Sequence, residues 1–132
     1  MERALANSSG SSGSARVSAI EKQAVHLYRK AMEAVKHPVR IEILALLAAK
    51  PGAKLSFSEL RDAFPKMNNA SLSHHLRVLQ MADLVARTVR LEERYKNPNP
   101  YYCFYSITAL GEYMLRQSRS VMEGVARFGI VT

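Results

Sequence analysis

Residues 68–84 read N-N-A-S-L-S-H-H-L-R-V-L-Q-M-A-D-L, and this stretch is the most informative about the fold. On a helix with about 100° between successive residues, Leu72, Leu76 and Leu79 share one stripe and should be buried. The opposite side carries small, hydrogen-bonding and cationic groups: Ala70, Ser73, His74, Arg77 and Met81. Such a surface can approach base edges in a major groove, so the pattern predicts a DNA recognition helix over residues 69–81.

The start of this helix is expected at Asn69, whose side-chain oxygen can cap the free amides of the first turn. The same amides could also lie against a phosphate. His75 falls nearer the apolar edge, so we expect it to pack rather than to contact DNA. An ordinary amphipathic helix with its polar side in water has the same pattern, so the neighbouring segments must decide.

A second, shorter helix is predicted upstream. Residues 56–59 have the S-x-x-E spacing of a capping box, and the helix they open runs through Leu60 and Phe64 until Pro65 ends it. The few residues after Pro65 form a connection short enough to hold the helix at residues 69–81 across this shorter helix. The two segments together predict a helix-turn-helix unit.

A β-hairpin is predicted downstream. Residues 84–91 alternate and are rich in β-branched side chains, residues 101–107 are rich in aromatic ones, and the polar linker 92–100 can continue neither strand. A hairpin directly after a recognition helix is a wing, here about residues 85–107, that would contact phosphates or the minor groove. The alternative is a solvated sheet edge with scattered cations.

Further helices flank this unit. One should run from Ser18 to near His37, where Pro38 opens the next, which continues to about Lys50. That next helix should place Ile41, Leu44, Leu47 and Ala48 in the core, with Arg40 facing DNA or solvent. Thr108 is the expected N-cap of the last helix.

The two terminal helices carry more apolar surface than a lone domain of this size could cover, which predicts a twofold dimer. Its interface is expected to consist of Ile20, Leu27, Tyr28, Leu110, Met114, Val121 and Val125. In the monomeric alternative, the N-terminal helix folds over the C-terminal one. The predicted fold class is therefore mainly α with a small β-hairpin (α+β), a winged helix-turn-helix with N- and C-terminal dimerisation helices. Residues 1–16, rich in Ser and Gly, should be disordered, and residues 17–132 should form the DNA-binding domain.

Five segments in this order and spacing carry a family resemblance: residues 35–44, 58–60, 73–79, 82–85 and 105–111. Together they resemble the ArsR-type winged helix-turn-helix transcriptional regulators over nearly all of residues 20–125. The resemblance implies a homodimeric DNA-binding regulator. Many members bind metal through cysteines on the first helix of the unit or through Asp and His on the last helix. Here residues 59–64 contain no Cys and residues 116–120 no His, so no metal or other cofactor is expected.

Composition fits a nucleic-acid partner. Lys and Arg number 19 against 11 acidic residues, which gives a net charge of +8 and an attraction to polyanions that salt weakens. We find no apolar run of membrane-spanning length and no cleavable signal, so no membrane partner and a cytoplasmic location are expected. Cys103 alternates within an aromatic strand and should be a small buried side chain rather than a redox switch. The sequence shows no nucleophile with a nearby base, no paired carboxylates and no phosphate-binding loop, so we do not expect an enzyme.

The sequence thus predicts a transcriptional regulator that reads double-stranded DNA as a homodimer, with repression favoured and the effector unknown. The expected DNA-binding residues are Asn69, Ser71, Ser73, His74 and Arg77 in the recognition helix, with Arg87, Arg90, Arg94 and Lys96 in the wing. Two alternatives stay open: an architectural protein that coats DNA without sequence preference, and a winged helix that binds a protein. The mixed Ser, His and Arg face favours base reading over coating, because coating needs charge but little donor and acceptor variety.

Overall fold

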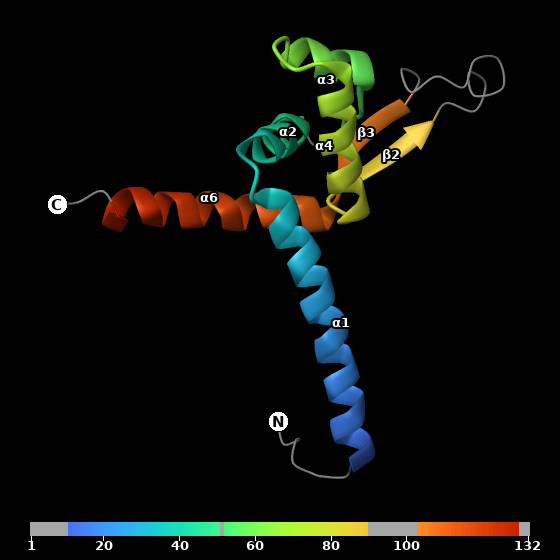
Figure 1. The fold of residues 1–132 in the computed structure, drawn as a ribbon, viewed down its shortest axis with the longest axis vertical. Helices are drawn as coiled ribbons and strands as arrows, with labels where there is room; N and C mark the ends of the chain where they lie inside the picture. Colours follow the sequence, from blue (N-terminus) through green and yellow to red (C-terminus); the bar gives the residue numbers. More distant parts are fainter. Residues whose placement is uncertain (1–10, 51, 90–102, 130–132) are drawn as a thin grey trace.

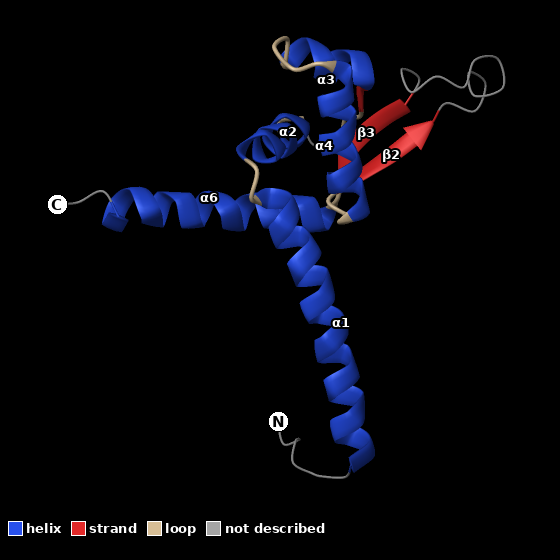
Figure 2. Cartoon of the chain, in the orientation of Figure 1, coloured by secondary structure: helices blue, strands red, loops and turns tan. Residues whose placement is uncertain are grey.

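The computed structural model describes residues 11–50, 52–89 and 103–129. Most of these residues are helical, and a small sheet lies at one side (Figure 2). The elements are α1 (Ser11–Val35), α2 (Pro38–Ala48), β1 (Leu55–Ser56), α3 (Phe57–Ala63), α4 (Asn69–Met81), β2 (Val85–Val89), β3 (Cys103–Ile107) and α6 (Ala109–Gly129). This is the winged helix-turn-helix fold predicted from the sequence.

The capping box at the start of α3 is confirmed. The Ser56 hydroxyl accepts from the Glu59 amide at 3.1 Å, and the Glu59 carboxylate accepts from the Ser56 amide at 2.8 Å. The expected cap of α4 is wrong by one residue, because Asn68, with extended backbone, caps the helix by accepting from the Ser71 amide at 2.8 Å. Asn69 is instead the first helical residue. Either Asn could cap, and only the backbone conformation distinguishes them.

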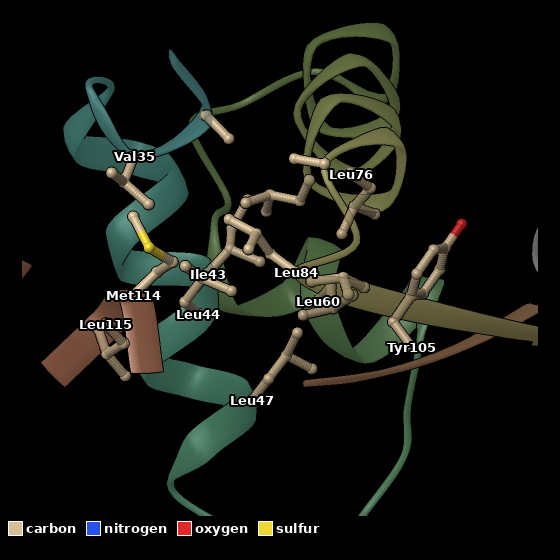
Figure 3. Close-up of a cluster of buried hydrophobic side chains, with 14 of the residues drawn as sticks. Val35, Ile43, Leu44, Leu47, Leu60, Leu76, Leu84, Tyr105, Met114 and Leu115 are labelled. Atoms are coloured by element: carbon tan, nitrogen blue, oxygen red, sulfur yellow. The ribbon is translucent and has the colours of Figure 1, made fainter. Parts of the chain in front are cut away.

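The core forms where α2, α3 and α4 meet the sheet. Leu72, Leu76 and Leu79 are all buried, as their spacing predicted. Figure 3 shows leucines from α2, α3 and α4 directed toward one another. In α2 the buried residues are Ile43, Leu44 and Leu47, whereas Ile41 and Ala48 are only partly buried. The expectation that Ile41 and Ala48 lie in the core was therefore wrong, and Ile43 is buried instead. Because α2 is apolar on most sides, the spacing of its apolar residues did not identify its buried face.

The sheet has three antiparallel strands in the order β1-β3-β2. The predicted hairpin is present, with Val85 opposite Ile107 and Arg87 opposite Tyr105. The two-residue strand β1, which pairs Leu55 with Tyr105, was not predicted. Cys103 is buried, as expected, with a free thiol.

A compact junction joins the end of α4 to the start of α6. Asp83 has a positive φ of 63°, and the Leu84 amide donates back to the Leu79 carbonyl at 3.0 Å. Thr108, the predicted N-cap, donates from its hydroxyl to the Asp83 carbonyl at 2.7 Å and accepts from the Gly111 amide at 2.9 Å. A side chain on Gly111 would overlap the Leu84 carbonyl oxygen. Helices α4 and α6 are thus fixed to each other by the hydrogen bonds of the Thr108 hydroxyl and by the close approach of Gly111 to the Leu84 carbonyl.

The terminal helices extend away from the other elements in different directions (Figure 1). α1 begins at Ser11, inside the segment expected to be disordered through residue 16, while residues 1–10 lie outside the described part. Extending an existing helix costs far less than nucleating one, so a composition typical of linkers does not fix where a helix starts. Among the described residues, no helix is long and apolar enough to cross a membrane.

Candidate nucleic-acid interface

The polar face of α4 is open to solvent. Asn69, Ser71, His74 and Arg77 are exposed, and Ser73 is half-buried at the edge of the face. The three buried leucines hold the helix from the opposite side, so no other element needs to cover this face. The geometry therefore gathers five predicted recognition residues on one accessible surface.

Met81 continues this face toward the end of the helix and is 65% exposed. The turn before α4 adds an exposed Lys66. Sequence reasoning did not select Lys66, although a cation beside the first turn of a recognition helix can reach a phosphate.

His75 packs between α4 and α2, as expected from its position at the apolar edge. Its Nδ1 accepts from Arg40 Nε at 3.1 Å, and its ring lies 4.9 Å from that of His37 and 5.7 Å from that of His74, measured between centroids. Burial lowers the pKa of His75 below its ordinary value, and the positive charge of Arg40 and the two other imidazoles lower it further. Arg40, expected to face DNA or solvent, is partly buried and donates a hydrogen bond to His75 of α4.

The wing is described only at its base. Arg87 is exposed on β2, but its side chain hydrogen-bonds the phenol of Tyr105 opposite. Burial raises the pKa of Tyr105, Cys103 adds to this rise, and Arg87 opposes it. Arg90, Arg94 and Lys96 lie outside the described residues.

The residues expected at a dimer interface divide into two groups. Ile20, Leu27, Tyr28, Val121 and Val125 are exposed on the projecting parts of α1 and α6. Leu110 and Met114 instead pack within their own chain, because the first half of α6 lies against α2.

A cavity of about 580 Å³ opens between α1, α2 and α6. Apolar side chains line most of it, including Met32, Ile41, Met114 and Val121, and Lys36 and Glu42 add opposite charges. Within the described ranges, no three His, Cys, Asp or Glu side chains come together in a way that could hold a metal ion.

Comparison with known proteins supports the fold. Residues 36–88 match the helix-turn-helix domain family, which corresponds to the span from the end of α1 to β2. No curated protein sequence matches the chain.

Solved structures show the same architecture. The YusO protein of Bacillus subtilis is 17% identical with a TM-score of 0.58, covering 94% of this chain and 87% of that one. The MepR–DNA complex of S. aureus is 15% identical with a TM-score of 0.55, covering 81% and 84%. A MepR point mutant from a multidrug-resistant S. aureus clinical isolate is 16% identical with a TM-score of 0.56, covering 92% and 81%. At such low sequence identities, the similarity shows a shared fold and nothing further.

Proposed function

We propose that this chain is a sequence-specific, double-stranded DNA-binding transcriptional regulator of the ArsR type, acting as a homodimeric repressor. The observation that carries the proposal is the exposed polar face of α4, which lies opposite its buried leucine stripe. The S. aureus MepR, which shares this fold, has a structure in complex with DNA, and this supports the same use of the fold here.

The recognition helix would enter the major groove with its first three turns. Arg77 offers a guanidinium that can bind O6 and N7 of guanine together, and His74 and Ser71 offer shorter donors and acceptors. Asn69 and Lys66 lie where the backbone of the duplex would pass the start of α4. This variety of groups favours base reading over coating.

The wing would add contacts that hold the domain on the duplex. Its cations Arg90, Arg94 and Lys96 occur in the linker between β2 and β3, where a wing tip meets phosphates or the minor groove. Arg87 would contribute less to DNA binding than these three residues, because its side chain is hydrogen-bonded to Tyr105. The net charge of +8 would supply the attraction that precedes specific binding.

The dimer would form through the projecting halves of α1 and α6. Every described side chain from Ser18 to Lys30 is exposed, although the segment carries Ile20, Leu27 and Tyr28 on one face. A helix this poor in contacts has too little burial to stay folded in isolation, so a second copy is the partner we propose. A twofold dimer would place its recognition helices about 34 Å apart, for half-sites one helical turn apart.

Selection of bound fragments from random duplexes tests the proposal, followed by salt titrations on the selected site and on a scramble of it. We expect a site with two inverted half-sites that binds at least about 10³-fold more tightly than the scramble. Equal affinity for both would favour an architectural coat, and binding to neither would favour a protein-binding winged helix. Placing the selected site in a reporter promoter tests repression, since transcription should fall when the protein is present.

A further inference from the structure

One side chain ties three helices of this fold together. Arg40, in the first turn of α2, donates from Nε to Nδ1 of His75 in α4 at 3.1 Å. It also donates from Nη1 to the backbone carbonyl of Glu33, near the end of α1, at 3.4 Å. The position of the recognition helix relative to α2 and α1 therefore depends in part on a single guanidinium.

The contact to His75 requires a neutral imidazole. An Arg side chain only donates, so Nδ1 must offer its lone pair, and the ring proton must then reside on Nε2. A protonated imidazole donates from both nitrogens and has no acceptor left. Protonation of His75 would replace an attractive contact with two cations that face each other.

The surroundings of His75 make that protonated state unfavourable. The groups that act on it are Arg40 from α2, His37 before α2 and His74 from α4, and each lowers its pKa, after the larger effect of burial. From α1, the Glu33 carboxylate pairs with Lys36 at 3.4 Å on an exposed surface and its carbonyl binds Arg40, so α1 supplies no neutralising partner through these contacts.

We propose that Arg40 and His75 form a positioning pair that holds the recognition helix in its DNA-binding position only while His75 is neutral, so that acidification weakens DNA binding through this pair. The inference rests on the proposed function, because it concerns the same face of α4. His74 and Arg77 lie on either side of His75 in the helix, and a binding site tolerates displacements of only about 0.5 Å. A small shift of α4 would thus move its DNA-contacting side chains out of register.

A second imidazole must be distinguished from His75. His74 is exposed on the face proposed to contact DNA and is the neighbour of His75 in the sequence. Variants that remove one imidazole at a time separate the contribution of His75 to the pH profile from any contribution of its neighbour.

His75→Asn is the test variant, because the Asn side-chain oxygen can take the place of Nδ1 as an acceptor without titrating. Affinity is measured for a fluorescein-labelled duplex carrying the selected site, from about pH 7.5 to about pH 5.5. We expect the native protein to lose more affinity than His75→Asn as the pH falls, by about twofold at the pH where half of the free molecules carry a proton on His75, since that halves the binding-competent fraction. His74→Asn is the matched control, because it leaves the Arg40–His75 contact in place and should keep the loss of affinity on acidification that His75→Asn lacks.

A second measurement does not depend on any variant. Nitrogen NMR of the histidine side chains in the unmodified, DNA-free protein should show His75 with an unprotonated Nδ1 at neutral pH and a pKa below the ordinary 6.5. Amide signals of α4 should shift with the same midpoint. The proposal is overturned if His75 titrates normally without moving the α4 signals, or if native and His75→Asn proteins share one pH profile. Failure to find any selected duplex would overturn the proposed function instead, and the NMR titration would still decide whether the pair positions α4.

Discussion

Helices α4 and α1 both carry an apolar stripe, yet they use it differently. Leu76 of α4 is 1% exposed, whereas Tyr28 of α1 is 61% exposed. The stripe of α4 finds its partners within the chain, in α2 and the sheet. Among the side chains described in α1, from Ser18 onward, the stripe finds partners only over the last turns, where Ala31, Ala34 and Val35 are buried. An apolar stripe therefore does not by itself show whether a helix is covered within its own chain.

The sharpest test of this contrast is truncation of the α4 stripe. Leu76→Ala should destabilise the fold by about 2–5 kcal/mol, because it removes buried methyl groups and leaves a cavity. Urea denaturation at fixed protein concentration measures the loss. Met81→Ala, on the exposed side of the same helix, is the control and should change stability by less than about 0.5 kcal/mol. Similar stabilities for the two variants would contradict the burial of Leu76.

The corresponding change in α1 should break assembly rather than folding. Tyr28→Glu places a charge in the centre of the proposed interface and should weaken dimerisation by at least about 2 kcal/mol, roughly thirtyfold in the dissociation constant. Sedimentation over a dilution series measures this, and circular dichroism reports whether the winged helix-turn-helix remains. Lys22→Glu, on the other side of α1, is the control. A Tyr28→Glu protein that stays dimeric would remove this stripe from the interface.

The junction between α4 and α6 offers a test of close packing at Gly111. Gly111→Ala should destabilise the protein by about 1–3 kcal/mol, because the new methyl group would overlap the Leu84 carbonyl and press on Ile107. Gly124→Ala, in the same helix with no neighbouring atom within 4 Å, should be neutral or stabilising. Thermal unfolding of both variants decides, and equal melting temperatures would show that the junction can relax.

The face of α4 opposite its stripe should respond in binding and not in stability. Arg77→Ala should cost about 1–3 kcal/mol on the selected site and less on random DNA, because a base contact is lost along with a charge. Fluorescence anisotropy on both duplexes measures the two losses. Lys22→Ala also removes one positive charge, but far from the face of α4 proposed to contact DNA, so it should change the affinity for either duplex little. Equal losses on both duplexes for Arg77→Ala would indicate coating.

Periodic segments made most of the fold predictable. The leucine spacing of α4, the capping box of α3 and the alternation of β2 each follow from local rules that tertiary packing did not override. Strand β1 was missed because two residues, Leu55 and Ser56, are too few to show a period. The extent of α1 was missed because helix extension depends on an existing helix more than on local composition.

The exposed face of α4 was predictable because it lies on one helix. Residues such as His74 and Arg77 follow from the angle between successive positions in α4. The hydrogen bond between Arg40 and His75 joins residues 35 positions apart, and no periodicity relates them. Tertiary contacts of this kind need the structure.

The smallest expected effect concerns the wing, where Arg94→Ala should weaken binding to selected and scrambled duplexes alike. A phosphate contact carries no sequence information, so its loss lowers both affinities and flattens the salt dependence by about 0.9 in the log–log slope. Arg87→Ala is the matched comparison. The Arg87 guanidinium is already hydrogen-bonded to Tyr105, so it should contact phosphate less than Arg94 does, and its removal should flatten the slope less. Salt titrations of the native protein and both variants measure the slopes. An unchanged slope for Arg94→Ala would remove that side chain from the interface, and α4 alone would then have to account for the attraction to DNA.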